Sequence, residues 1–202
     1  MKKWMALIAL VGFGLAGLQA QAAGNAAAGK AKSAVCAGCH GVDGNSAAPN
    51  FPKLAGMDGA YIAKQLADFK SGARKDPTMV GMVAALSKKD MEDLGAYYAS
   101  QKRNTGVANA DKDALEKAKL LYRGGNPKMG IAPCMGCHGP AGAGIPARFP
   151  AVSGQHAAYS QKQLLDFKSG TRSNDGGIMG PIAFKLSETE IKAVSEYMAG
   201  LH

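Results

Sequence analysis

Two short stretches of the sequence each place two cysteines and a histidine within five residues. They are CAGCH at residues 36–40 and CMGCH at residues 134–138, so the second begins 98 residues after the first. Two thiols at i and i+3 lie on one helical turn, where each can form a thioether with a vinyl group of haem, and the histidine that follows can bind the iron. The pattern predicts two covalent haem c groups, with thioethers at Cys36, Cys39, Cys134 and Cys137 and iron ligands at His40 and His138.

Other uses of paired cysteines fit this spacing less well. A structural zinc site needs its second C-x-x-C within about 15–20 residues, whereas the two motifs here are 98 residues apart. A thioredoxin-like thiol pair belongs in a βαβ context, and the sequence shows no alternating strand pattern. A plain disulfide explains neither the adjacent histidine nor the duplication of the motif. Haem attachment is therefore the preferred interpretation.

An internal repeat indicates which residue binds the other face of each iron. When residues 86–87 are aligned with residues 186–187, Met79 aligns with Met179, and no other methionine has a methionine counterpart. A single methionine in a loop more often fills a gap in a core. Two methionines at equivalent loop positions, 39 and 41 residues after the motif histidines, indicate ligands instead. Coordination by histidine and methionine raises the reduction potential of a haem.

Further residues of the repeat are candidates for supporting the haem groups. Pro52 and Pro150 each lie twelve residues after a motif histidine. A carbonyl there would accept the histidine Nδ1–H and fix the orientation of the ring; the alternative is a proline that only marks a loop. Four aromatic residues either line the haems or form ordinary core: Tyr61, Tyr159, Phe69 and Phe167.

The elements that must position these residues are helical and occur twice. From Phe51 to Arg74, 14 of 24 residues are identical to those 98 positions later. Apolar spacing predicts helices at 59–71 and 157–169, and further helices at 26–35 and 111–122 lead into the two motifs. SKKD at 87–90 and SETE at 187–190 are capping boxes that begin a last helix in each half. We therefore predict an all-α protein of two homologous domains.

The N-terminus indicates export. Lys2 and Lys3 are followed by an apolar run over residues 4–18 and by Ala20-Gln21-Ala22, which together predict a secretory signal peptide at residues 1–22. The apolar run is too short for a membrane span, which needs about 20 apolar residues. We expect a protein of the bacterial periplasm with an N-terminal domain at 23–104 and a C-terminal domain at 105–202.

The charge of the chain favours protein partners over nucleic acid. The formal net charge is +9 for the whole chain and +7 once the two lysines of the leader are removed. The basic residues are spread along the chain, without the run of lysines and arginines expected of a nucleic-acid site. We therefore expect no nucleic acid as a partner. A modest basic excess favours encounter with acidic surfaces of partner proteins.

The chain resembles the dihaem cytochrome c4 family over essentially the whole mature sequence. The resemblance rests on CAGCHGVDGNSAAPNFPKLAG, on its second copy beginning CMGCHGPAGAG, and on the repeated DFKSG segments. It implies two class I cytochrome c-like domains in tandem, related by a pseudo-twofold axis, with haem propionate edges near the interface. Carried over by residue, it implies the axial pairs His40/Met79 and His138/Met179. One departure is that the segment before Met79 is two residues shorter than that before Met179.

The resemblance also implies a function. It implies electron transfer in the periplasm between components of the respiratory chain, toward a terminal oxidase. Its partners would be redox proteins, either a membrane-bound quinol-oxidising complex or a terminal oxidase, with peripheral membrane association. We expect a carrier and not an enzyme. The alternative, a dihaem peroxidase, needs one iron with a displaceable or missing sixth ligand, and the paired methionines argue against it; a thiol oxidoreductase is more distant still.

Overall fold

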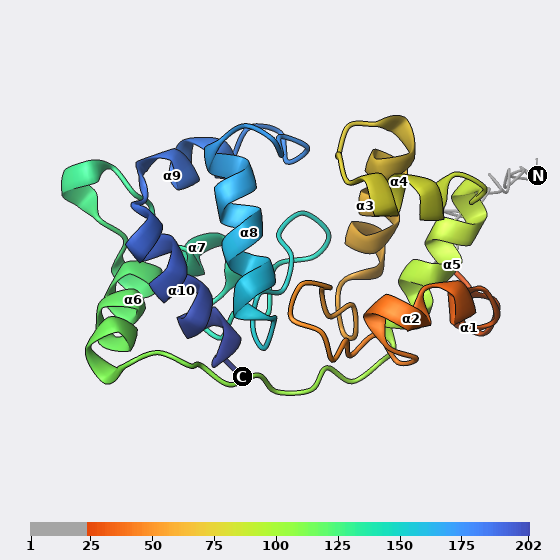
Figure 1. Ribbon diagram of the computed structural model, residues 1–202, viewed down its shortest axis with the longest axis horizontal. Coiled ribbons are helices and arrows are strands. Elements are labelled where there is room, and N and C mark those ends of the chain that lie inside the picture. The colour runs from red at the N-terminus through yellow and green to blue at the C-terminus, as the bar shows by residue number, and fades with distance from the viewer. Residues whose placement is uncertain (1–23) are drawn as a thin grey trace, which may run out of the picture.

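The computed structural model describes residues 24–202, so the expected signal peptide at 1–22 lies outside the described residues. Within the described range the chain forms two groups of helices that lie beside each other (Figure 1). The segment that joins the two groups runs along one side of both, at the bottom of the view. Residues 24–202 contain no β-strand, only the isolated bridges Asn126–Ile131 and Ile145–Phe149. The predicted all-α class is confirmed.

The two halves repeat the same order of helices. The N-terminal half contains α1 (Ala26–Lys32), η1 (Ser33–Val35), α2 (Ala37–His40), α3 (Gly59–Ser71), α4 (Pro77–Val83) and α5 (Lys88–Ala99). The C-terminal half contains α6 (Lys112–Gly124), η2 (Pro127–Met129), α7 (Met135–His138), α8 (Ala157–Lys168), α9 (Met179–Lys185) and α10 (Glu188–Ala199). In the first half α5 packs against α1 and α3, and in the second α10 packs against α6 and α8. No helix of residues 24–202 is long and apolar enough to cross a membrane.

Two of these helices differ from the sequence-based expectation. Met79 and Met179 were expected in loops, but they lie in the short helices α4 and α9. Helix α4 begins where it does because the Asp76 side chain caps its first turn and Pro77 occupies the first helical position, where a missing N–H costs nothing. The expectation of loops was wrong, since an aspartate followed by proline is itself a signal for the start of a helix.

Both predicted capping boxes are confirmed. The Ser87 and Ser187 hydroxyls accept the backbone N–H of Asp90 and Glu190, and the two carboxylates accept the serine backbone N–H in return. Each box satisfies two backbone donors that the first turn of a helix leaves unpaired. The boxes therefore fix the starts of α5 and α10, which are the central helices of their domains.

The capping boxes lead to a stability prediction. Replacing Ser187 with alanine is expected to lower the free energy of unfolding by about 1 kcal/mol, because the Glu190 N–H loses its 3.2 Å acceptor. Equilibrium denaturation followed by far-ultraviolet circular dichroism measures the change. The same substitution at the exposed Ser173 is the control. Equal stabilities for the two variants would contradict the capping assignment.

Each domain has its own small core, and the cysteine motif lies at its edge. The N-terminal core consists of Met57, Ile62, Leu94, Tyr97 and Tyr98, with Cys36 packed against it. The C-terminal core consists of Leu121, Tyr122, Ile131, Leu164, Leu186, Ile191, Val194 and Met198, with Cys134 packed against it. Domains of this size bury little apolar surface and often need a covalent or metal-linked addition to be stable.

Buried polar contacts hold the two domains together. The backbone N–H and carbonyl of Lys53 each bond the side-chain amide of Gln155 at 2.9 Å, and Lys53 Nζ donates to the Gly154 carbonyl at 2.8 Å. Arg103, in the segment between α5 and α6 that joins the two halves, donates to the Ala55 carbonyl at 2.7 Å and to the Ser153 carbonyl at 3.1 Å. These contacts join backbone groups of both domains, and so they fix the position of one domain against the other.

Candidate functional site

The two cysteine motifs adopt the same local structure. Cys36 precedes α2, which ends at His40, and Cys134 precedes α7, which ends at His138. The histidine N–H donates to the carbonyl of the first cysteine at 3.0 Å in α2 and 2.9 Å in α7. All four cysteines are free and partly exposed. The two cysteines of each pair are therefore about one helical turn apart, the first at the N-cap and the second on the same short helix as the histidine.

The two histidines are buried and held in one orientation. His40 is 7% exposed and His138 is 9% exposed, and their Nδ1 atoms lie 2.9 Å from the carbonyl oxygens of Pro52 and Pro150. A carbonyl oxygen can only accept a hydrogen bond, so Nδ1 carries the proton and Nε2 keeps its lone pair for a metal. The predicted contacts with the proline carbonyls are confirmed. Burial lowers the pKa of both histidines, and the bond to proline opposes this only in part.

The aligned methionines are also held alike, through backbone contacts that the sequence analysis missed. The Met79 N–H donates to the Asp76 carboxylate at 3.1 Å, and the Met179 N–H donates to the carboxylate of Asp175. Both methionines are partly buried, and Met179 packs against the C-terminal core that Cys134 also touches. The aspartate that lies three residues before Met79 and four before Met179 is the sequence signal that could have predicted these backbone contacts. Met79 and Met179 thus occupy equivalent positions in the two domains.

The first thiol of each motif lacks the lowered pKa of a reactive cysteine. Burial raises the pKa of the Cys134 thiol to about 11 and also raises that of Cys36. Thiols of disulfide oxidoreductases have pKa values lowered to roughly 3.5–7.5, because the thiolate is the reacting species. The two first cysteines of the motifs are therefore protonated at neutral pH, which disfavours the thiol oxidoreductase.

The four predicted aromatic residues divide into two kinds. Phe69 and Phe167 are buried, at 6% and 7% exposure, and each has an arginine guanidinium over its ring. Tyr61 and Tyr159 lie instead at the domain interface, where each hydroxyl accepts a hydrogen bond from an arginine of the other domain. The tyrosines are therefore interface residues, a role that the sequence analysis did not consider.

The donors present in each domain fit haem c. Each domain offers two free thiols on one turn, a buried imidazole with a free Nε2, and one thioether held near a helix start. Histidine and methionine are the axial donors of cytochromes c. The helical fold and these two sites define the class of protein as a c-type cytochrome with two domains.

Comparison with known proteins identifies the family to which this two-domain cytochrome belongs. The protein-family model for cytochrome c matches residues 26–102 and 128–202. Cytochrome c4 of Pseudomonas aeruginosa is 52% identical over 196 residues, which are 96% of each chain. The crystal structure of reduced recombinant cytochrome c4 from Pseudomonas stutzeri is 49% identical, with a TM-score of 0.84 over 89% of this chain and 100% of that one. The chain belongs to the cytochrome c4 family, whose members are dihaem electron-transfer proteins, and its two domains bind covalently attached haem c.

A further relative has a more specific name. The thiosulfate dehydrogenase electron acceptor of Stutzerimonas stutzeri is 43% identical over 170 residues, which are 82% of this chain and 78% of that protein.

The predicted fold of two tandem cytochrome c domains is confirmed by the family match and by the solved structure.

Proposed function

We propose that the protein is a periplasmic electron carrier between a membrane-bound quinol-oxidising complex and a terminal oxidase, associated peripherally with the membrane. The observation that carries this proposal is the duplicated site, in which the same donors are held by the same contacts in both domains. The leader at 1–22 would direct export, and the mature domains would be 23–104 and 105–202.

The residues of the chain would hold each haem on both faces. The thiols at 36, 39, 134 and 137 would tether the two groups, and bound haem c would supply reversible one-electron chemistry. His40 and His138, oriented by the proline carbonyls, would each bind an iron through Nε2. Met79 and Met179, held through their N–H groups, would supply the second protein ligand. Two protein ligands would leave no open coordination position, which favours a carrier over a peroxidase.

The domain contacts also serve electron transfer. Lys53 and Gln155 exchange two hydrogen bonds across the interface, and Arg103 bonds carbonyls of both domains. A fixed arrangement of the domains would keep the distance between two bound haems constant. We therefore propose that electrons pass between the two domains within one molecule before they leave it.

The direct test uses membranes that contain the quinol-oxidising complex and the terminal oxidase but are depleted of soluble cytochrome. Addition of the reduced holoprotein is expected to restore quinol-dependent oxygen consumption in proportion to its concentration. A protein lacking both methionine ligands, with Met79 and Met179 replaced by alanine, is the matched control. Failure of the membranes to oxidise the reduced wild-type protein would rule out the terminal oxidase as acceptor.

A second candidate donor comes from the relative named as an electron acceptor of thiosulfate dehydrogenase. In this alternative a thiosulfate-oxidising enzyme, and not the quinol-oxidising complex, reduces the protein. Mixing the oxidised holoprotein with that enzyme and thiosulfate, and recording the visible spectrum, distinguishes the donors. Rapid reduction there, combined with slow reduction by quinol-supplied membranes, would favour the thiosulfate route.

Ionic strength provides a further prediction about the partner surface. The mature chain carries +7, which becomes +3 when the four haem propionates are ionised. We expect electron exchange with an acidic partner to slow moderately as salt rises to physiological strength, because exposed charges are then screened over about 8–10 Å. Stopped-flow kinetics over a series of salt concentrations measure this. A rate that rises steadily with salt would mean that the docking face is acidic.

A further inference from the structure

The C-terminal domain exposes a large aromatic side chain beside two lysines. Phe184, near the end of α9, is 72% exposed. The ammonium of Lys168 lies 5.7 Å from the centroid of its ring and donates to the Phe184 carbonyl at 2.9 Å. Lys185, the next residue, donates to the Gly130 carbonyl at 2.8 Å. The aromatic ring is therefore free at the surface, while the lysines around it are held in place by backbone oxygens.

The segment between α6 and α7 presents a second exposed apolar side chain. Met129 is 49% exposed and ends η2, between the exposed Lys128 and Gly130. Asn126 and Ile131 exchange two backbone hydrogen bonds of 2.9 Å on either side of this turn, and Ile131 is 3% exposed in the C-terminal core. The segment is thus anchored to the core. We call the side chains of this surface the outer patch: Lys128, Met129, Lys168, Phe184 and Lys185.

The first domain has no such surface, although its proposed iron ligands are the same. In the alignment that pairs the two capping boxes, Phe184 and Lys185 correspond to the exposed Ala84 and Ala85. The segment that carries Met129 has no counterpart in the first domain. The two domains therefore share the chemistry of the site but differ in what their surfaces can contact.

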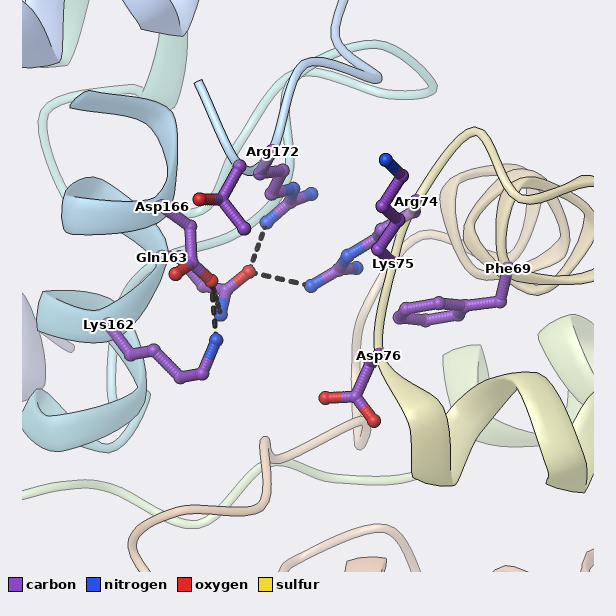
Figure 2. Close-up of a pocket in the computed structure, with 9 residues that line it drawn as sticks. Phe69, Arg74, Lys75, Asp76, Lys162, Gln163, Asp166 and Arg172 are labelled. Atoms are coloured by element: carbon purple, nitrogen blue, oxygen red, sulfur yellow. Dashed lines mark hydrogen bonds and ion pairs between the residues drawn. The ribbon is translucent and has the colours of Figure 1, made fainter. Parts of the chain in front are cut away.

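The outer patch lies on the free side of its domain. Figure 1 shows the end of α9 and the segment between α6 and α7 on the side of the C-terminal half that faces away from the N-terminal half. The opposite side is occupied, because Arg74 and Arg172 both donate to Gln163 between the two domains, at 2.7 and 2.8 Å (Figure 2). A partner protein can therefore reach the outer patch without disturbing the contacts between the domains.

The composition of the outer patch fits a protein partner with an acidic rim. Phenylalanine and methionine are enriched at the buried centre of protein interfaces. Lysines around them would meet carboxylates, which speeds encounter and fixes orientation. In the first turn of α10, Glu190 closes the capping box, and the exposed Glu188 is one carboxylate against three lysines. Because two of the lysines are fixed by carbonyl oxygens, they suit carboxylates at defined positions better than mobile lipid headgroups.

We propose that the outer patch is the docking surface for a redox protein whose own face is apolar at its centre and acidic at its rim, an inference that rests on the proposed electron-carrier function. Phe184 follows Met179 on the same helix by five residues, which is about 8 Å along the axis. A partner seated on Phe184 therefore contacts the helix that carries the proposed iron ligand of this domain. Electrons then enter or leave the protein through the C-terminal domain.

The test uses an acidic blue copper protein as the probe partner. Stopped-flow kinetics follow the transfer of one electron from the reduced holoprotein to Cu(II), which becomes Cu(I). Lys185→Glu and Lys128→Glu are each expected to lower the second-order rate constant about tenfold at low salt and much less at high salt, because each reverses a charge at the rim. Phe184→Ala is expected to lower it about fivefold at either salt concentration, because an apolar contact is not screened.

The matched control is Lys88→Glu. Lys88 belongs to the first domain, its side chain is 90% exposed, and its counterpart in the second domain is Glu188. The substitution changes the net charge by the same amount as Lys185→Glu, so it measures the effect of total charge alone. It is expected to lower the rate constant by about twofold at most. Visible spectra of all four variants should match that of the wild type, since none replaces a proposed iron ligand.

Two outcomes would overturn the inference. Patch variants that behave like Lys88→Glu would show that only total charge matters. Wild-type protein that sediments with phosphatidylglycerol vesicles, combined with loss of sedimentation in Phe184→Ala and unchanged rates with the copper protein, would assign the outer patch to a lipid surface. Failure of the respiratory membranes to exchange electrons with the wild type, while the copper protein still distinguishes Lys185→Glu from Lys88→Glu, would contradict the proposed respiratory route and support the docking surface.

Discussion

Replacing Met79 or Met179 with alanine is expected to lower the reduction potential of one haem far beyond 59 mV, the shift that corresponds to a tenfold change for one electron. A thioether ligand favours ferrous iron, and the identity of axial ligands moves haem potentials over about 0.8 V. Each substitution should also open one iron to carbon monoxide. Redox titration and carbon monoxide difference spectra of the two single variants and the wild type measure both effects.

The control for this experiment is a methionine in the same short helix. Met82 lies on α4 three residues after Met79, is 42% exposed, and aligns with Ile182 in the second domain. Met82→Ala should leave the potential of the first haem close to that of the wild type. If Met82→Ala lowers the potential and Met79→Ala does not, the alignment of the two methionine helices is wrong.

Removing the two thiols of one motif is expected to remove one haem and to unfold the domain that carried it. The N-terminal core cluster consists of five buried apolar side chains, and Cys36 packs at its edge. Without the attached haem such a core is too small to be stable alone. In the variant with Cys36→Ala and Cys39→Ala, intact-protein mass spectrometry should show one haem addition, compared with two on a wild-type chain that begins at about Ala23.

The second motif provides the matched control. The variant with Cys134→Ala and Cys137→Ala should also carry one haem, but limited proteolysis should now degrade the C-terminal domain and spare the N-terminal one. Two haem additions in either double variant, or an unmodified wild-type mass, would refute the assignment of these cysteines. Circular dichroism should show loss of about half of the helical signal in each variant.

Much of the site could be predicted from the sequence because it depends on local spacing. Two cysteines and a histidine within five residues determine the covalent chemistry wherever the helix turn forms, and both turns form as expected. The twelve-residue spacing from histidine to proline likewise led to the correct carbonyl contacts. The helices of the repeat followed from apolar periodicity and capping boxes, which are also local. The short helices α4 and α9, which carry Met79 and Met179, were missed, although an aspartate before each methionine was visible.

The sequence by itself thus determined the haem chemistry, the two homologous domains and most of the helices. Only the tertiary structure decided how the domains meet, because that depends on residues about one hundred positions apart. Arg74 and Gln163 are ordinary polar residues of the repeat until the interface places them 2.7 Å apart. The repeat predicts two similar domains, but the hydrogen bonds between Lys53 and Gln155 occur only once. The residue that corresponds to Lys53 in the other domain is Ala151, and the one that corresponds to Gln155 is Met57. A hydrogen bond across an interface needs complementary groups at one point in space, and no local pattern specifies that point.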